Sequence, residues 1–464
     1  MTTLWAHQIA GVDYLGSHPA AMLAWEMGTG KTRAVIARIR KDRPRLALVI
    51  APKKVCRVWP PEFAEFGEAE AEADPDPPRV VVLDGATSAK KLIQARAAHA
   101  STDARPLVFV ANYESIWRGD LGSWALSQPW SLIVLDESQR AKDPFGRCGR
   151  FIMRLGKCAP RKICLTGTPM PHSPLDLFNQ FRFLDATIFG WEFTRFKATY
   201  AVTQRRQFGR KKSADVVVGF KNLDDMHKKL SSISNNVKKA NVLDLPPVTH
   251  QLRSVELGRE ARRVYSGLET RLKADVGTGE VTAANVMVRS LRLQQVTSGY
   301  ASVEKNSATT IDSAKADALA EVLEDIAKHE SVVVFCRFRY DLDVVEKTAK
   351  SLGRGYCELS GRRDELDLWG ATRGAVLGAQ IRSGSLGISL VQAATAIYYS
   401  ATWSLGEFDQ SVARLDRAGQ TRSVTCVHLL AHNTIDESIY WALRARRSVV
   451  DHVIDGFKTT RKRG

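Results

Sequence analysis

The segment Glu26–Thr32 (EMGTGKT) constrains the fold of this 464-residue chain more than any other part of the sequence. An apolar run (Ala20–Trp25) precedes it, and a stretch of helical character, AVIARIRK (Ala34–Lys41), follows it. Strand, glycine-rich turn and helix in this order form a phosphate-binding loop, because backbone N–H groups at the helix N-terminus point at phosphate oxygens. Trp25 stands where the usual spacing has its first glycine, so a chance G-x-G-K-T turn is the alternative. The flanking strand and helix favour a nucleotide site.

The residues of this loop have separate expected roles. Gly28 and Gly30 let the backbone approach the phosphates, because glycine adopts turn conformations that other residues avoid. Lys31 is expected to reach the β- and γ-phosphates of ATP, and Thr32 to ligate Mg²⁺. The full set expected to contact the nucleotide here is Met27, Gly28, Thr29, Gly30, Lys31 and Thr32.

Short apolar runs without polar alternation recur in two regions of the chain. Such runs are typical of strands that are covered on both faces, as in parallel α/β sheets. In the first region they are Ala20–Trp25, Leu46–Ala51, Val80–Asp84, Leu107–Ala111, Ser131–Asp136 and Lys162–Gly167. In the second region they are Ser331–Cys336, Gly355–Leu359, Thr395–Ser400 and Val424–Leu430. The sequence therefore predicts an α/β fold with two parallel sheets.

Two adjacent carboxylates, Asp136 and Glu137, follow the apolar run that begins at Ser131. Ligands of open parallel sheets lie at the carboxyl ends of the strands, so these side chains are expected to face the phosphate loop. Asp136 is the candidate for holding Mg²⁺, and Glu137 for orienting or deprotonating the attacking water. A solvated Asp-Glu loop is the alternative, which the preceding buried strand disfavours.

Two arginines, Arg414 and Arg417, lie three positions apart in Phe408–Val424. On a helix they would share one face, from which planar guanidinium groups could reach a γ-phosphate. Arginines used in this way act only when two lobes close, which would couple hydrolysis to motion. A salt-bridged surface helix is the alternative for the segment taken alone.

Residues 190–305 show sparse strand signals and frequent helical periodicity, which predicts a mainly helical insert. Within residues 191–240, twelve Lys or Arg stand against four Asp or Glu, and Gln204–Lys212 is the densest basic cluster. Basic side chains in this region could contact phosphates, or could cover a solvated insert. The sequence leaves both interpretations open.

The overall charge favours a polyanionic partner. Lys and Arg number 67 against 50 Asp and Glu, a formal net charge of +17, although a generally basic enzyme would show the same excess. Seven scattered cysteines without a CxxC pair argue against a zinc site and suit a reducing compartment. No secretory signal and no run of eighteen apolar residues is present, so we expect a cytoplasmic protein, in a bacterial cytosol or in a host cell if phage-encoded, with no membrane partner.

Taken in order, the motifs resemble helicase superfamily two (DEAD/DEAH-box-like), and within it the Swi/Snf-type DNA translocases, over nearly the whole chain. The resemblance is carried, besides the phosphate loop, by the segments Leu4–Leu15, Ile50–Phe63, Val110–Ile116, Asp136–Asp143, Leu165–Phe178, Lys238–Leu257, Val332–Arg339, Gly384–Ala393, Gln410–Gln420 and His432–Ile439. The Leu-Pro-Pro element within Lys238–Leu257 is similar to the Swi/Snf group rather than to generic DEAD-box proteins. A minimal motor of bacterial or phage style is implied.

The resemblance also implies roles for single residues. Gln8 would read the adenine base, and Gly387 would lie near the nucleotide. Gln410 would join Lys31, Asp136, Glu137, Arg414 and Arg417 in catalysis. Nucleic-acid contacts would come from Lys53, Trp59, Asn112, Arg337 and Ser383, while Thr166 and Thr168 would link nucleotide state to the grip on nucleic acid.

The implied architecture is a pair of RecA-like parallel-sheet lobes with a mainly helical insert. We place the ATP-binding lobe at residues 1–188, the insert and linker at 189–307, and the second lobe at 308–464. The implied activity is a nucleic-acid-dependent ATPase that moves along double-stranded DNA, with ATP and Mg²⁺ as cofactors and with protein partners that the sequence does not identify.

Two departures from the family pattern stand out. The acidic motif continues with Ser138 and Gln139 where the family has Ala-His or Gly-His, which puts coupling through position 139 in doubt. The segment Gly361–Leu377 is only loosely similar. Three other functions stay open: a helicase that separates strands of DNA or RNA, a scaffold with a decayed ATPase, and a P-loop kinase. Intact Lys31 and Glu137 disfavour the scaffold, and a second sheet disfavours the kinase.

Overall fold

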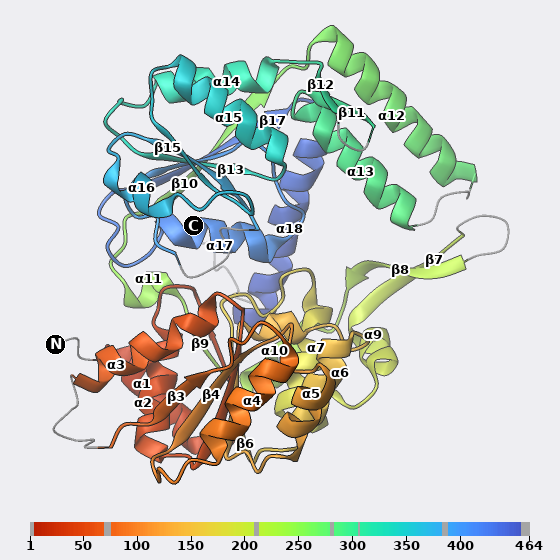
Figure 1. The fold of residues 1–464 in the computed structure, drawn as a ribbon. Helices are drawn as coiled ribbons and strands as arrows, with labels where there is room; N and C mark the ends of the chain where they lie inside the picture. Colours follow the sequence, from red (N-terminus) through yellow and green to blue (C-terminus); the bar gives the residue numbers. More distant parts are fainter. Residues whose placement is uncertain are drawn as a thin grey trace, which may run out of the picture. The chain divides into compact units, whose positions relative to one another are not determined.

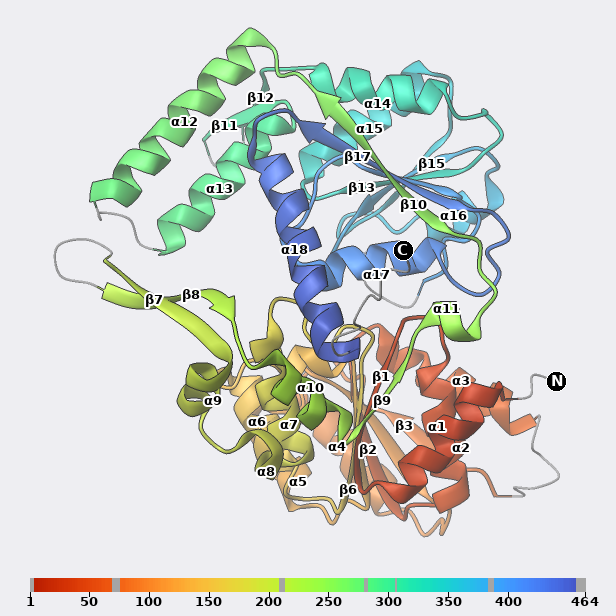
Figure 2. The same ribbon diagram turned by 180° about the vertical axis from the view of Figure 1, so that it is seen from behind.

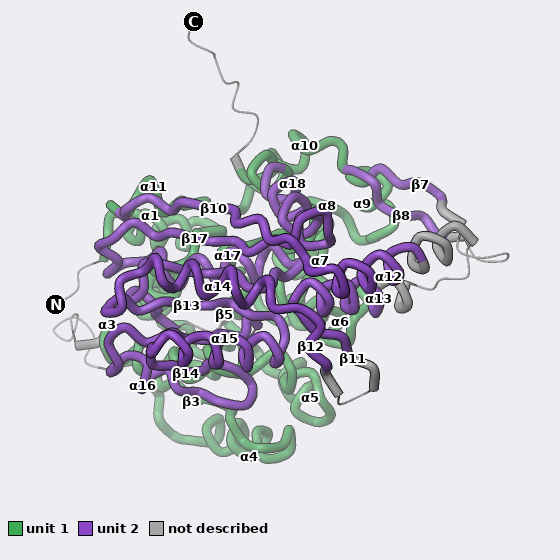
Figure 3. Tube along the Cα trace, turned by 90° about the horizontal axis from the view of Figure 1, so that it is seen from above, with its two compact units in different colours: residues 1–201, 220–244, 449–464 green, residues 202–219, 245–448 purple. Residues whose placement is uncertain are grey.

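The computed structural model describes residues 4–68, 76–207, 213–278, 283–304, 307–382 and 388–455. The chain divides into two compact units (Figure 3). Unit 1 comprises Met1–Ala201, Phe220–Asp244 and Val449–Gly464, and unit 2 comprises Val202–Gly219 and Leu245–Ser448. Among the described residues, no helix is both long and apolar enough to cross a membrane.

Unit 1 is built on one parallel sheet of seven strands in the order β3-β4-β2-β5-β6-β1-β9 (Figure 1). Its strands are β1 (Ala20–Trp25), β2 (Leu46–Ala51), β3 (Arg79–Val82), β4 (Leu107–Asn112), β5 (Leu132–Asp136), β6 (Arg161–Leu165) and β9 (Ser234–Val237). Its helices are α1 (Ala6–Ser17), α2 (Lys31–Asp42), α3 (Trp59–Glu68), α4 (Ser88–His99), α5 (Gly119–Ser127), α6 (Arg147–Leu155), α7 (Leu177–Leu184), α8 (Ala186–Phe189), α9 (Phe193–Tyr200), α10 (Leu223–Ser231) and α11 (Lys239–Val242). Short 3₁₀ turns are η1 (Val55–Arg57), η2 (Ser138–Ala141) and η3 (Pro174–Asp176).

Unit 2 holds a second sheet of six strands in the order β10-β17-β16-β13-β15-β14, again with parallel pairing throughout (Figure 2). Its strands are β10 (Val248–Val255), β13 (Val332–Cys336), β14 (Tyr356–Leu359), β15 (Val376–Gln380), β16 (Thr395–Tyr398) and β17 (Val424–Ala431). Two-stranded ribbons are formed by β7 (Ala201–Gln207) with β8 (Ser213–Phe220) and by β11 (Tyr300–Glu304) with β12 (Ser307–Thr310). The helices are α12 (Arg259–Thr278), α13 (Ala283–Thr297), α14 (Ala314–Glu324), α15 (Arg339–Ser351), α16 (Leu366–Ala371), α17 (Leu405–Leu415) and α18 (Ile435–Asp455).

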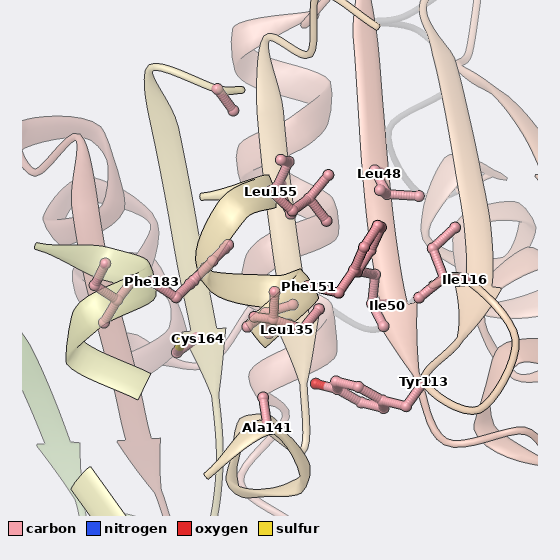
Figure 4. Packing of buried hydrophobic residues seen from close by; sticks show 14 of the residues in the cluster. Leu48, Ile50, Tyr113, Ile116, Leu135, Ala141, Phe151, Leu155, Cys164 and Phe183 are labelled. Carbon is pink, nitrogen blue, oxygen red and sulfur yellow. The ribbon is translucent and has the colours of Figure 1, made fainter. Parts of the chain in front are cut away.

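Each sheet separates two apolar cores, which explains why the strands lack polar alternation. In β2, Leu46, Leu48 and Ile50 pack into one core of unit 1, while the alternate residues Ala47 and Val49 pack into the other. Figure 4 shows the first of these cores, where Leu48 and Ile50 lie beside Phe151 of α6. Unit 2 repeats the pattern along β13.

The last turns of α18 belong to unit 1, although the helix begins in unit 2. Val453 is fully buried in the same core as Met226 and Leu230 of α10. The ring of His227 is hydrogen-bonded to the carbonyl of Val453 at 2.9 Å. Residues near the C-terminus therefore complete the core of the N-terminal unit.

The two predicted parallel sheets are confirmed, and all ten apolar runs contain strands. The sequence did not predict the strands β9, β10 and β15 or the two ribbons, β7–β8 and β11–β12. The sequence of β9, SNNV, is polar, and most of β10 is exposed at a sheet edge, so neither shows an apolar run. In β15, Gly378 interrupts the apolar pattern, and a Cβ there would lie 2.5 Å from the Tyr356 hydroxyl. The expected insert therefore supplies a strand to each sheet, and the boundaries at residues 188 and 307 stay predictions.

Candidate nucleotide site and adjoining basic groove

The phosphate loop connects β1 to α2, as the sequence predicted, and α2 begins at Lys31. Gly28 and Gly30 adopt φ values of 83° and 81°, in the left-handed region that favours glycine. A Cβ at Gly30 would lie 2.1 Å from Nε2 of Gln8, so a side chain there would also have to displace the Gln8 amide. The loop thus leaves the backbone at the N-terminus of α2 open to phosphate oxygens.

Lys31 lies among the groups that a nucleotide would meet. Its Nζ donates to the carbonyls of Trp25, at 2.8 Å, and Glu26, at 3.1 Å. Burial lowers the pKa of this ammonium group, and the nearby carboxylates of Glu137 and Asp136 act in the opposite direction. A bound phosphate would be a stronger, anionic acceptor for Lys31 than these two backbone carbonyls.

Side chains of the N-terminal helix α1 form hydrogen bonds to the phosphate loop. Gln8 is buried, and its Nε2 donates to the carbonyl of Thr29 at 3.2 Å. The ring of His7 is hydrogen-bonded to the same carbonyl at 2.8 Å. Gln8 therefore contacts the phosphate loop, and its role in reading the base stays a prediction. No role for His7 was predicted from the sequence.

Asp136 ends β5 and is buried beside Glu137. Burial and the Glu137 carboxylate raise the pKa of Asp136 to about 7, while the N–H of Trp59 and the charge of Lys31 act against this shift. Two crowded carboxylates in a buried site fit a divalent cation, which would compensate both charges. Asp136 and Thr32, at the start of α2, are the residues that would hold Mg²⁺.

Gln139 joins the acidic pair to the threonine motif by hydrogen bonds. Its Nε2 donates to Oε2 of Glu137 at 2.6 Å, and its Oε1 accepts from Oγ1 of Thr166 at 2.8 Å. The N–H of Thr168 donates in turn to Oγ1 of Thr166 at 3.0 Å. Gln139 thus lies hydrogen-bonded between Glu137 and Thr166, and coupling through position 139 stays a prediction. Glu137 has a left-handed φ of 53°.

The expected nucleotide contacts Met27 and Thr29 have structural partners of their own. Thr29 is fully buried and donates its hydroxyl to the carbonyl of Glu26 at 2.8 Å. A Cβ at Gly167 would lie 2.8 Å from Cγ of Met27, so the threonine motif packs closely against the phosphate loop.

In unit 2, Arg414 and Arg417 converge on one carbonyl. Arg414 Nη1 donates to the carbonyl of Ile388 at 3.4 Å, and Arg417 Nη1 donates to it at 3.2 Å. The helix expected to carry both, α17, ends at Leu415, so Arg417 lies in the following turn. The two guanidinium groups are therefore gathered by a shared acceptor. Gln410 is half-buried one turn before Arg414.

The remaining site residue described in unit 2 is Arg337, which directly follows β13. Its Nη1 donates to Oε1 of Gln294 on α13 at 2.7 Å. Burial lowers the pKa of the Arg337 guanidinium, with a further contribution from Arg382. Ser383 and Gly387 lie outside the described residues, as does part of Gly384–Ala393.

A groove of about 900 Å³ lies in unit 1, at the loops that follow β2, β3 and β4. Five cationic side chains and two carboxylates are among its lining residues: Lys53, Lys54, Arg57, Lys91, Arg118, Asp84 and Glu114. The expected contacts Lys53 and Asn112 both line it. Lys91, which the sequence did not single out, donates from its buried Nζ to Oδ1 of Asn112 at 2.6 Å and to Oγ of Ser115 at 2.9 Å.

Trp59 does not line this groove. Its side chain is fully buried, and its Nε1 donates to Oδ2 of Asp136 at 3.1 Å. A direct contact with nucleic acid would require Trp59 to be uncovered, so its expected contact stays a prediction. The sequence could not reveal the bond to Asp136, because the two residues are 77 positions apart.

The sequence model of the SNF2-related domain matches residues 7–305 of this chain. Protein p41 of Acyrthosiphon pisum secondary endosymbiont phage 1 is 26% identical, and the match covers 93% of this chain and 94% of that protein. The DNA annealing helicase and endonuclease ZRANB3 of Bos taurus is 25% identical, and the match covers 94% of this chain but 39% of that protein. The structure of the Sulfolobus solfataricus SWI2/SNF2 ATPase core in complex with dsDNA aligns over 98% of this chain and 94% of that one, at 21% identity and a TM-score of 0.43.

Proposed function

The chain belongs to the SNF2-related domain family, and on that basis we propose that it is an ATP-driven motor that moves along double-stranded DNA. One observation carries the proposal. The phosphate loop with Lys31, the carboxylates Asp136 and Glu137, and the basic groove all lie in unit 1, at loops that follow strands of one sheet. Such an arrangement suits an enzyme whose hydrolysis responds to a bound polyanion.

In the proposed reaction, Lys31 and the N–H groups of the loop bind the β- and γ-phosphates. Thr32 and Asp136 hold Mg²⁺, which neutralises charge on the phosphates when it is bound. Glu137 orients the attacking water and accepts its proton, and Gln139 holds the Glu137 carboxylate in place. Arg414 and Arg417 would stabilise the charge that develops on the transferred phosphoryl group.

Charge supports nucleic acid as the partner. Lys53, Lys54 and Arg57 line one side of the groove, and the chain as a whole carries a formal charge of +17. Contacts from such side chains to phosphates carry little sequence information and weaken steeply with salt. We therefore expect binding with weak sequence preference. Duplex DNA is the favoured form because a relative named as a DNA annealing helicase matches along 94% of this chain.

Phosphate release tests the proposal when duplex DNA, single-stranded DNA and RNA are compared side by side at equal nucleotide concentration. We expect duplex DNA to give the largest stimulation. We expect Glu137→Gln to bind ATP and retain it without turnover. Equal rates with all three nucleic acids, or no stimulation by any, would contradict the proposed motor.

Movement along DNA and separation of its strands require different readouts. Displacement of a third strand from a triplex would report movement on an intact duplex. Release of a labelled strand from a forked duplex would instead favour the alternative, a strand-separating helicase.

A further inference from the structure

Two segments that line the basic groove each continue into a buried aromatic side chain bonded to Asp136. In the first segment, Lys53 and Arg57 line the groove, and Trp59 lies two residues further on. The indole Nε1 of Trp59 donates to Oδ2 of Asp136 at 3.1 Å. In the second segment, Asn112 lines the groove, and the hydroxyl of the adjacent Tyr113 donates to the carbonyl of Asp136 at 2.9 Å. The Trp59 and Tyr113 side chains thus link the groove-lining segments to Asp136.

The two segments are also tied to one another at the end of β2. The backbone N–H of Tyr113 donates to the carbonyl of Ala51 at 3.4 Å, and Sγ of Cys56 lies 3.6 Å from the same oxygen. Ala51 pairs with Asn112 in the sheet. Displacement of either segment would therefore be transmitted to the other as well as to Asp136.

Tight packing makes this arrangement suitable for transmitting a small displacement. The Trp59 side chain is fully buried and Tyr113 is 3% exposed. Figure 4 shows the Tyr113 hydroxyl beneath Leu135, next to the end of β5. Because protein interiors are close-packed, a shift of either ring requires its neighbours to shift as well. The Trp59 bond acts on the Asp136 carboxylate, and the Tyr113 bond acts on the backbone just before Glu137.

We propose that Trp59 and Tyr113 are positioning residues that couple occupancy of the groove by duplex DNA to the placement of Asp136 and Glu137. The inference rests on the proposed function, since it assumes that DNA fills the groove and that the two carboxylates serve ATP hydrolysis. In this proposal, both aromatic residues transmit a displacement within unit 1, and neither contacts DNA or ATP.

The test uses Trp59→Phe, which keeps a buried ring but removes the donor, and Tyr113→Phe, which removes only the hydroxyl. Trp130→Phe is the matched control, because Trp130 is also buried in unit 1 and its Nε1 donates to the carbonyl of Ala125, at 2.6 Å. Thermal melting of each full-length variant establishes that it is folded before the coupling is measured.

Two quantities report the coupling. The first is the ratio of ATP turnover with saturating duplex to turnover without it. The second is the ratio of the duplex Kd without a non-hydrolysable ATP analogue and Mg²⁺ to the duplex Kd with them, which measures the coupling between the two bound ligands directly. We expect Trp59→Phe to lower both ratios by about tenfold, Tyr113→Phe to lower them in the same direction, and Trp130→Phe to keep the wild-type values.

The outcomes separate this inference from the proposed function. If the wild-type protein neither binds duplex nor is stimulated by it, the proposed function fails whatever the variants do. If the wild type is stimulated and Trp59→Phe and Tyr113→Phe both keep its two ratios, the inference is overturned. A loss in Trp59→Phe that extra Mg²⁺ restores would also overturn it, because Trp59 would then serve only to support the metal site. Should Trp59→Phe fail to fold, Tyr113→Phe alone decides.

Discussion

The two units are built on the same kind of parallel sheet, and their candidate functional groups differ in chemistry. In unit 1, burial lowers the pKa of Lys31, and burial together with the Glu137 carboxylate raises the pKa of Asp136 to about 7. In the described part of unit 2, the candidate groups are Arg337, Arg414 and Arg417, whose planar guanidinium groups suit hydrogen bonds to phosphate oxygens. One scaffold thus carries groups suited to proton transfer and metal binding, and the other supplies fixed positive charge.

The largest expected effect is that of Lys31→Ala, which tests whether unit 1 carries the nucleotide chemistry. Removing the ammonium group leaves the β- and γ-phosphates without their lysine partner, so we expect turnover below detection in a phosphate-release assay. Lys41→Ala is the control, because Lys41 lies on the same helix and forms an exposed ion pair with Asp13. Measurable turnover by Lys31→Ala above the background of a protein-free reaction would contradict the site.

Arg417→Ala tests whether unit 2 supplies charge for catalysis and not for binding. We expect ATP to bind with near-normal affinity, while turnover falls by about 10³-fold or more, as for arginines that stabilise phosphoryl transfer elsewhere. Binding of a fluorescent ATP analogue and phosphate release measure the two effects. Arg422→Ala, which removes a guanidinium group that donates to the carbonyl of Gln392, serves as control. Normal turnover in Arg417→Ala would contradict a catalytic role for the arginines of unit 2.

Gln139→Leu sharpens the role of unit 1 by removing both bonds of the amide with little change in volume. Because the Glu137 carboxylate would then lose its donor, we expect kcat to fall about tenfold, the typical value of one positioning interaction, with little change in KM for ATP. Gln139→His restores a donor and an acceptor and should recover part of the rate. A change in KM alone would show that Gln139 supports nucleotide binding instead.

The smallest expected effect concerns acid stability, for which unit 2 has a buried histidine. Burial, with contributions from His250 and Arg444, lowers the pKa of His428 to about 3. The unfolded chain therefore binds a proton that the folded unit does not, so the stabilisation is complete above pH 6.5 and is lost as the pH falls towards 3. At pH 5 the resulting decrease in the free energy of unfolding is about 2 kcal/mol.

Hydrogen exchange at pH 7 and pH 5 checks this effect, because it reports β17 and β2 separately. We expect protection of β17 to fall on acidification and His428→Phe to reduce that fall. The variant matters because Asp341, in the same unit, has a pKa raised to about 6, so its protonation favours the folded state as the pH falls. An identical fall in both proteins would exclude His428 as its source.

The sequence predicted those parts of the molecule whose chemistry is local along the chain. The phosphate loop, Asp136 and the apolar strands are each defined by a few adjacent residues, and the structure places them as expected. What it could not predict depends on contacts between distant segments. Strands β9 and β10 carry polar residues and are strands because of their neighbours. The motif that contains Trp59 predicted a contact with nucleic acid, and only the fold shows that the indole N–H donates to Asp136. Gln139 departs from the family pattern, yet its amide donates one hydrogen bond to Glu137 and accepts one from Thr166.

The strand β9 has a consequence for how the protein is made. A ribosome delivers β1 about two hundred residues before Ser234–Val237, its partner at the edge of the sheet, and delivers Val453 about two hundred residues later still. Until β9 and Val453 have been synthesised, the nascent N-terminal half has an unpaired edge at β1 and an uncovered apolar surface, and both favour aggregation. A fragment ending at residue 188 would keep these defects permanently, so expression of the ATP-binding half alone should extend at least through β9 and would still lack the helix turn that closes its core.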